Sequence, residues 1–478
     1  MIPNIHDYLS KTETTWLQLL KDLVSIDSSK AGDPKGVNQV LNHVATYLKK
    51  IGISSEQSST PVGNILTAKV GISGPKILCL GHVDTVLPPE GNLLWHEAPA
   101  EDRIYGSGAM DMKGGDVYMV AIAETVKQFN LPVQLTLMLV PDEETGSHHS
   151  KAAIETAAKN HDYCIVFEAS ETMNDIVRSR KTGIHSEYFF QKIDQPFYLK
   201  LAQFLTQVVD LIDLAAGKTI NPILSLKSAT PPRSNVVPDQ ASLELKFSYP
   251  QLHEFNMFCD KLYDTLKKAT LPGAKFSLRL IDEQETFSVY RYTVIGKKAH
   301  AGNNIEDGIN AWVELGHRLQ ALESLLKKHP LFKLEFLLTP DTRHLTPDLR
   351  LQFDMRSNTL SDLDQLQAAA AALLASTGVA AYLSKPFKPD TPSRPAMEPS
   401  AQLDAAITKT FTDAGLTVNL VHKGGMSDGN ITRGVGCPTT DAWGPIGADL
   451  HTYREHIVRS QFLPKLKLAV ELVLAVKN

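Results

Sequence analysis

The period of the apolar positions changes twice along the chain and divides it into three regions. Up to about residue 182, runs with helical spacing alternate with short buried strands. From 183 to 388 strands and helices follow in a looser α+β manner, and from 400 the first style returns. Strands that alternate with helices predict an α/β domain with a mostly parallel sheet. Its expected elements are helices at 13–30, 37–51, 115–128, 151–160, 401–414 and from 463, and strands at 64–70, 76–80, 132–140, 162–167 and 417–422.

The middle region looks internally duplicated. The stretches 183–285 and 286–388 each contain, in order, a strand, a helix, two strands, a helix and a strand, with low residue identity. We therefore expect an α/β domain made of 1–182 and 389–478, interrupted by an inserted α+β domain of two tandem repeats. The alternative is an insertion of unrelated α+β structure.

Composition narrows the class of protein. Of the 478 residues, 43% are hydrophobic and 21% are charged, which is ordinary for a globular protein. The formal net charge is -5, so the composition does not indicate the excess of basic residues that binding to nucleic acid or to an anionic membrane requires. The N-terminus lacks the features of a signal peptide, and no apolar stretch reaches the roughly 18 residues of a membrane span. Four cysteines without a C-x-x-C spacing predict reduced thiols in a cytoplasmic protein.

A candidate metal ligand follows the strand at 76–80. This strand runs out into Gly81-His82-Val83-Asp84, and on extended backbone His82 and Asp84 point to the same side. His82 can therefore bind a metal while Asp84 holds its other ring nitrogen. A structural histidine is the alternative for such a pair taken alone.

Further motifs supply carboxylates. Asp111 stands in GSGAMDMKGG, whose glycines allow a tight turn around a carboxylate able to bridge two metals; a helix cap is its alternative role. The strand at 132–140 ends in three acids, of which Glu144 can bind metal and Glu143 can act as a general base, unless the turn is merely solvated. Another apolar strand ends at Glu168.

His451, in the loop GADLHTYRE, completes the set. Two imidazoles and three carboxylates are the ligands needed to hold two zinc ions about 3.5–4 Å apart around one water. Four of the five sites follow strands or turns, where open α/β sheets bind ligands. The spare acid Glu143 favours a metallohydrolase over a non-catalytic metal-binding protein, and cobalt or manganese can occupy similar sites.

The motifs together resemble the family of co-catalytic zinc exopeptidases and amidohydrolases, which includes aminoacylases, glutamate carboxypeptidases, desuccinylases, acetylornithine deacetylases and bacterial dipeptidases. The matching motifs, in the family's order, are GHVDTV at 81–86, GSGAMDMKGG at 106–115, DEETGS at 142–147, FEAS at 167–170, GKKAHAGNNIEDGINA at 296–311, GGMSDGN at 424–430 and GADLHTYRE at 447–455.

The resemblance implies a role for each candidate in the α/β domain. One zinc takes His82 and Glu168, the other takes Glu144 and His451, Asp111 bridges them, Glu143 is the base and Asp84 orients His82. Glutamate at 168 resembles the aminoacylases and glutamate carboxypeptidases, whereas the dipeptidases usually carry aspartate there. The segment around Arg394 resembles the carboxypeptidase segment that grips a substrate α-carboxylate; its alternative role is a solvated linker arginine.

By this resemblance the α/β domain is the catalytic domain and the two expected repeats form its lid. The lid motifs are divided between the two repeats. The first retains Asn235, and the second retains His300 and Arg356. In dimeric relatives the lid histidine reaches the partner's active site, so a double lid implies a monomer in which His300 stabilises the oxyanion and Asn235 and Arg356 line the substrate cleft.

Two enzymatic functions follow from the resemblance. The first is a zinc carboxypeptidase or aminoacylase acting on a small peptide or N-acyl amino acid with a free carboxylate, which Glu168 and Arg394 favour. The second is a dipeptidase of the same superfamily, which the double lid favours.

Overall fold

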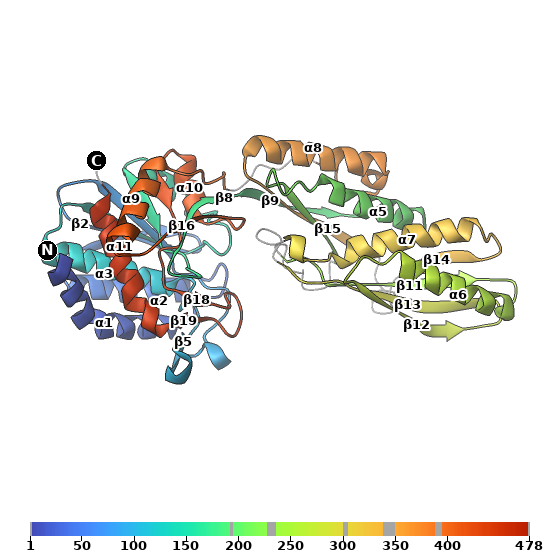
Figure 1. Cartoon of the computed structure of the whole chain (residues 1–478), viewed down its shortest axis with the longest axis horizontal. Helices are drawn as coiled ribbons and strands as arrows, with labels where there is room; N and C mark the ends of the chain where they lie inside the picture. The colour runs from blue at the N-terminus through green and yellow to red at the C-terminus, as the bar shows by residue number, and fades with distance from the viewer. Residues whose placement is uncertain are drawn as a thin grey trace. The chain divides into compact units, whose positions relative to one another are not determined.

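The computed structural model describes residues 2–191, 195–226, 236–299, 305–337, 349–387 and 394–476. The chain divides into two compact units (Figure 1). Unit 1 comprises Met1–Arg180 and Ser393–Asn478, and unit 2 comprises Lys181–Pro392. From the sequence we expected these boundaries at 182/183 and 388/389, so the observed divisions lie a few residues away.

Unit 1 is built on a mixed sheet of six strands in the order β1-β2-β6-β3-β7-β17. The strands from β6 to β17 run parallel, whereas β2 is antiparallel to both of its neighbours. The outer strand β1 was not expected, because its sequence SEQSST is polar and mostly exposed. The strands are β1 (Ser55–Thr60), β2 (Gly63–Val70), β3 (Lys76–His82), β6 (Gln134–Val140), β7 (Tyr163–Val166) and β17 (Thr439–Thr440).

Helices cover both faces of this sheet. In the central strand β3, Ile77 and Cys79 belong to the larger core with α1, α3 and α11, whereas Leu78 and Leu80 belong to a smaller core with α4 and α10. Burial on both faces is the usual setting of parallel strands. The helices are α1 (Ile2–Val24), α2 (Pro34–Lys50), α3 (Lys113–Phe129), α4 (Lys151–Ala158), α9 (Ala401–Asp413), α10 (Asp428–Gly434) and α11 (Phe462–Ala475).

Helix α1 begins and ends earlier than the predicted range of 13–30. Ile5 and Leu9 are buried and extend the apolar stripe of Trp16 toward the N-terminus. The stripe stops at Val24, because the following segment SIDSSKAGD is mostly polar. Among the described residues, no helix is long and apolar enough to cross a membrane.

Two small sheets complete unit 1. One pairs β8 (Asp175–Arg180) in parallel with β16 (Asn419–Lys423). The other has the order β18-β19-β5-β4 and therefore joins the C-terminal motif of His451 to the segment before Asp111. Its strands are β4 (His96–Ala98), β5 (Arg103–Tyr105), β18 (Gly447–Ala448) and β19 (His456–Val458).

Unit 2 contains a first antiparallel sheet with the order β10-β15-β9. An isolated antiparallel bridge between Phe190 and Leu383 lies next to β9. The segment before Leu383, where a strand was expected, is a short 3-10 helix. The elements of this part are β9 (Thr182–Phe189), α5 (Gln195–Gln207), β10 (Thr219–Leu226), β15 (Leu349–Ser357) and α8 (Leu360–Ser376).

A second antiparallel sheet is formed by the chain between β10 and β15. Its order is β12-β13-β11-β14. Helices α5 and α7, one from each part, lie side by side (Figure 1). The elements are β11 (Gln240–Ser248), α6 (Leu252–Lys268), β12 (Lys275–Glu283), β13 (Phe287–Ile295), α7 (Ala311–Lys327) and β14 (Lys333–Leu337).

The predicted tandem arrangement of the two repeats is wrong. Strand β10, from the expected first repeat, pairs with β15 from the second, and β12 pairs with β13 across the expected boundary at 285/286. Each part has the order strand, helix, strand, strand, helix, and the first three strands of each take the same spatial order. The second set is therefore nested inside the first rather than following it.

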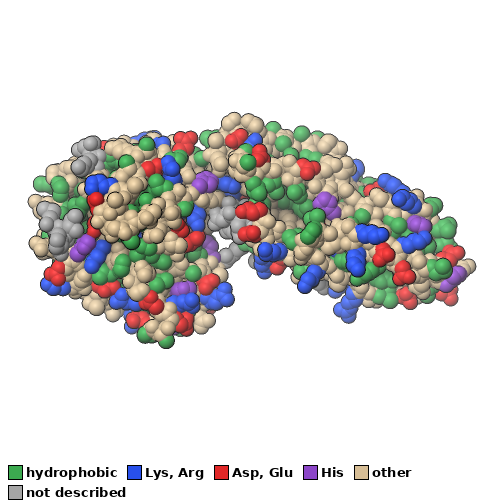
Figure 2. Space-filling model, viewed as in Figure 1, with side chains coloured by type: hydrophobic (Ala, Val, Ile, Leu, Met, Phe, Trp, Pro, Cys, Tyr) green, Lys and Arg blue, Asp and Glu red, His purple; other side chains and the backbone are tan. Residues whose placement is uncertain are grey.

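The surface mixes both signs of charge. On the face shown in Figure 2, lysine and arginine side chains are interspersed with aspartate and glutamate side chains. This mixture agrees with the small net charge of -5.

Candidate active site

Three parallel strands bring candidate ligands to one edge of the sheet. Strand β3 lies between β6 and β7 and ends at His82. Glu144 follows the end of β6, and Glu168 follows the end of β7. Because the carboxyl ends of parallel strands share an edge, these three side chains converge there.

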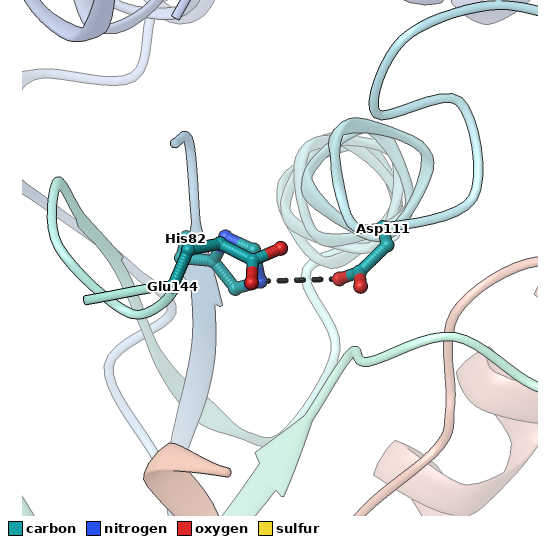
Figure 3. A group of neighbouring side chains, drawn as sticks. All are labelled: His82, Asp111 and Glu144. Atoms are coloured by element: carbon teal, nitrogen blue, oxygen red, sulfur yellow. Dashed lines mark ion pairs between the residues drawn. The ribbon is translucent and has the colours of Figure 1, made fainter. Parts of the chain in front are cut away.

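Asp111 lies just before α3 and contacts both candidate imidazoles. Its Oδ1 is 3.2 Å from Nε2 of His82, and its Oδ2 is 3.1 Å from Nε2 of His451. Figure 3 shows the side chains of His82, Asp111 and Glu144 directed toward one another. One carboxylate thus faces two imidazoles through separate oxygens, as a bridging ligand does.

His451 lies in the loop between β18 and β19. Its Nε2 is 3.2 Å from Oε1 of Glu144. His451 has a φ of 59°, and Asp449 in the same loop has a φ of 63°. Non-glycine residues in the left-handed region are uncommon and concentrate at functional sites, so this loop is shaped to present His451.

Glu168 and Glu143 form a second group of candidate ligands around His82. Oε1 of Glu168 is 3.8 Å from Nε2 of His82. Ligand atoms of His82, Glu143 and Glu168 all lie within 4.8 Å of one another, and so do those of His82, Asp111 and Glu144. Two overlapping groups with His82 in common therefore surround one small region.

Asp84 contacts both His82 and the turn that carries Glu143 and Glu144. Its Oδ1 is 3.3 Å from Nδ1 of His82, and its backbone oxygen is 3.0 Å from the same nitrogen. Its carboxylate also accepts the backbone N–H groups of Glu143, at 3.1 Å, and of Glu144, at 2.9 Å. One residue thus fixes both the ring of His82 and the turn that carries the two glutamates.

The electrostatics of the site reflect crowded, buried carboxylates. Burial, followed by the nearby Asp111, raises the pKa of Glu144 to about 7 and that of Glu168 well above its ordinary value. Burial alone would lower the pKa of His451, but Asp111 and Glu144 outweigh it and raise that pKa to about 11. Acids that resist ionisation beside imidazoles that retain protons indicate a site short of positive charge.

The donor set fits divalent metal ions. Nε2 of His82 and Oδ1 of Asp111 are buried and have no hydrogen-bond partner among the described residues. They lie 3.2 Å from each other as an ion pair, and buried ligand atoms that form no hydrogen bond beside further carboxylate oxygens are what a site for a cation offers. The imidazole and carboxylate ligands suit zinc and the neighbouring transition metals.

Glu455 supports the site, although it was noted in the sequence only as part of a motif. Its carboxylate accepts the backbone N–H groups of Met110, at 3.0 Å, and of Asp111, at 3.2 Å. Burial, followed by Asp111, raises the pKa of Glu455 to about 7. Its position four residues after His451 was the available signal.

Arg394 is buried in unit 1 beside the candidate base. Its guanidinium contacts Glu143 and Asp428. Asp428 was also not singled out in the sequence, although GGMSDGN belongs to the matching motifs. The arginine is only 5% exposed.

The remaining predicted residues belong to unit 2. Arg356 is buried, and its Nε lies 2.9 Å from Oδ1 of Asp354 in the same strand, β15. Asn235 and His300 lie outside the described residues.

The family follows from comparison with known proteins. The model of peptidase family M20/M25/M40 matches residues 78–475, and the chain therefore belongs to this family. This covers every candidate ligand and most of the chain.

Individual relatives are more distant. Carboxypeptidase G2 from Pseudomonas sp. is 24% identical over 277 residues, which cover 54% of this chain and 65% of that protein. Acetylornithine deacetylase from Vibrio atlanticus is 31% identical over 163 residues, covering 32% and 43%. The chain thus matches less than two thirds of the length of either relative.

A solved structure agrees in fold over nearly the whole chain. The M20 family metallo-carboxypeptidase Sso-CP2 from Sulfolobus solfataricus has a TM-score of 0.53 and 14% identity, and the match covers 96% of this chain and 98% of that one. At this identity the likeness concerns the fold alone.

Proposed function

We propose that the protein is a zinc-dependent hydrolase that cleaves an amide bond in a small peptide or N-acyl amino acid with a free carboxylate. The observation that carries this proposal is the position of Glu143, whose carboxylate lies with ligand atoms of His82 and Glu168 within 4.8 Å. A carboxylate beside a metal-ligand pair is suited to act as a general base.

Two zinc ions are assigned to the site. His82 and Glu168 would hold one, Glu144 and His451 the other, and Asp111 both. The separate contacts of the Asp111 oxygens with the two imidazoles support this division. When bound, two such ions polarise an amide carbonyl and lower the pKa of water toward neutrality.

Glu143 performs the proton transfers in the proposed mechanism. It accepts a proton from the attacking water and returns it to the departing nitrogen, so the same carboxylate serves as base and then as acid. Asp84 holds the backbone of Glu143 and faces Nδ1 of His82. It thereby leaves Nε2 directed toward the ligand group.

Glu168 and the relatives support a carboxypeptidase or aminoacylase type of substrate. The relatives include a carboxypeptidase and a deacetylase, and both names denote cleavage next to an acylated nitrogen. The test is a panel of N-acyl amino acids, dipeptides and C-terminally amidated dipeptides, assayed with measured metal content. Turnover of N-acyl amino acids and loss of activity on C-terminal amidation are expected. Metal-loaded protein that hydrolyses no member would overturn the proposal and favour a non-catalytic metal-binding protein.

A dipeptidase of the same superfamily is the second candidate, and the two sheets of unit 2 favour it. Their common strand order supports a nested double lid, which in a monomer would replace the lid of a partner. In this candidate His300 donates to the oxyanion, and Asn235 and Arg356 bind substrate. A requirement for a free substrate amine would select it, and His300→Ala should then lower kcat more than KM is raised.

A further inference from the structure

Arg394 binds both the side chain and the backbone of Glu143, the candidate base. Its Nη1 lies 2.7 Å from Oε1 of Glu143, and its Nη2 donates to the backbone oxygen of Glu143 at 3.0 Å. One rigid, planar group therefore holds the side chain and the main chain of the same residue. Charge-assisted hydrogen bonds of this kind are among the strongest in proteins.

Two further groups fix the arginine from its other side. Nη2 of Arg394 donates to Oγ of Ser147 at 2.7 Å and lies 3.2 Å from Oδ1 of Asp428. The Ser147 hydroxyl donates to the same Asp428 oxygen. Asp428 is the first residue of α10, where Ser427 forms a capping box with Asn430, so the carboxylate stands on a defined helix terminus.

The turn that carries Glu143 is closed onto this cluster. The backbone N–H of Gly146 donates to the Glu143 oxygen at 2.8 Å, and that of Ser147 donates to the Asp142 oxygen at 2.7 Å. Arg394 and Asp428 are 5% and 1% exposed. A buried guanidinium bound to a base, a turn and a helix end is poorly placed to meet a substrate from solvent.

We propose that Arg394 is a positioning residue that holds Glu143 in place for proton transfer, with Asp428 and Ser147 as its support. The proposal rests on the proposed function, in which Glu143 is the base. With Oε1 of Glu143 engaged by Arg394, Oε2 is the oxygen that takes the proton. This role differs from the substrate-carboxylate role predicted for Arg394 from the sequence, and one set of variants separates the two.

Steady-state kinetics distinguishes positioning from substrate binding. Since a displacement of about 1 Å in a catalytic group costs roughly a hundredfold in rate, Arg394→Ala should lower kcat by about that factor, with KM within about threefold of the wild type. Arg394→Lys, which keeps one charge, should recover part of kcat. Asp428→Asn should lower kcat less than Arg394→Ala does, again without raising KM. A rise in KM with unchanged kcat would overturn the proposal and establish the substrate role.

A double-variant cycle tests whether Arg394 acts through Glu143. Arg394→Ala combined with Glu143→Gln should be no slower than Glu143→Gln alone, because residues that act as a unit are not additive. The matched control is Arg178→Ala, which removes a part-exposed ion pair with Asp404 in the same unit and should leave kcat unchanged. Additive losses in kcat would contradict the proposal.

A readout independent of turnover separates this proposal from the proposed function. Shifts in melting temperature for Arg394→Ala and Glu143→Gln should be non-additive in the metal-loaded protein, while metal content stays at the wild-type value. If the wild type hydrolyses nothing but the shifts are coupled, the proposed function fails and the Arg394–Glu143 contact stands. Additive shifts, or loss of metal in Arg394→Ala and Arg394→Lys alike, would overturn the positioning role itself.

Discussion

At the scale of single residues, the main feature of the site is its excess of negatively charged groups. Asp111, Glu144 and Glu168 are buried together, and the pKa values of the two glutamates are raised for that reason. Such a group is costly unless cations compensate it. The same crowding that makes the site unfavourable on its own makes it suited to bind cations.

Replacing the base tests the residue scale most directly. Glu143→Gln keeps the size and the hydrogen-bonding oxygen but cannot take a proton. We expect kcat to fall by about 10²–10⁴-fold, with metal content unchanged by elemental analysis. Glu168→Gln is the companion variant, since it should lower metal content. Loss of metal in Glu143→Gln would instead identify Glu143 as a ligand.

At the scale of elements, strand ends and helix termini present the chemistry. The parallel strands β3, β6 and β7 deliver His82, Glu144 and Glu168 to one edge, and α10 supplies Asp428 beside Arg394. Strand β2, which pairs antiparallel with β6, carries none of these side chains. The site therefore depends on the parallel part of the sheet.

Helix α11 contains a buried lysine that predicts a pH dependence of stability. Lys465 is fully buried, with its Nζ 5.4 Å from the ring centroid of Trp443. Burial lowers the pKa of Lys465 to about 7. Between pH 7 and the ordinary lysine pKa of about 10.4, the unfolded chain binds more protons than the folded one, so this residue makes stability rise with pH.

Lys465→Met should remove that contribution. Below about pH 7 the folded wild type must bury the charge, so the variant should be more stable there by up to about 4–5 kcal/mol, the free energy that corresponds to the lowered pKa. Its advantage should shrink as pH approaches 10. Urea unfolding at pH 6, 8 and 9.5 measures the change. An advantage independent of pH would mean that the pKa of Lys465 is not lowered, so that the lysine stays charged in the folded protein over this whole range.

At the scale of the whole molecule, the two units have separate cores. The cores of unit 1 contain its sheet and helices, and the core of unit 2 lies within 184–383. All five candidate ligands, Glu143 and Arg394 belong to unit 1. Metal should therefore stabilise one unit and leave the other unaffected.

Chelation tests this division. Calorimetry of the metal-loaded protein should show that removal of metal lowers the melting temperature of one transition, since a ligand stabilises only the folded state that binds it. A transition belonging to unit 2 should not move. Equal shifts in every transition would show that the units unfold as one or that both bind metal.

The nested sheets of unit 2 predict a monomer. A double lid would make a partner's lid unnecessary, so light scattering after size exclusion should give the chain mass of 52.6 kDa. Dilution over a hundredfold range should not change it. A stable dimer would contradict the double-lid interpretation.

The ligand motifs were readable from the sequence because they follow a local rule. An apolar strand that ends in histidine or glutamate must place that side chain at an edge, whatever the strand pairs with. His82, Glu144 and Glu168 were predicted as ligands in this way. The order of the motifs also identified the family, because that order can be read from the sequence without knowing which segments contact one another.

Tertiary structure alone decided which segments meet. A tandem and a nested pair of repeats have the same order of elements, so periodicity cannot separate them, and only the pairing of β10 with β15 does. The partners of Arg394 could not be predicted from the sequence either. The two acids that it contacts, Glu143 and Asp428, belong to other motifs and are distant from it along the chain. Local burial fixes which face of an element is apolar. Contacts between distant segments depend on the packing of the whole unit, and that packing determines which guanidinium meets which carboxylate.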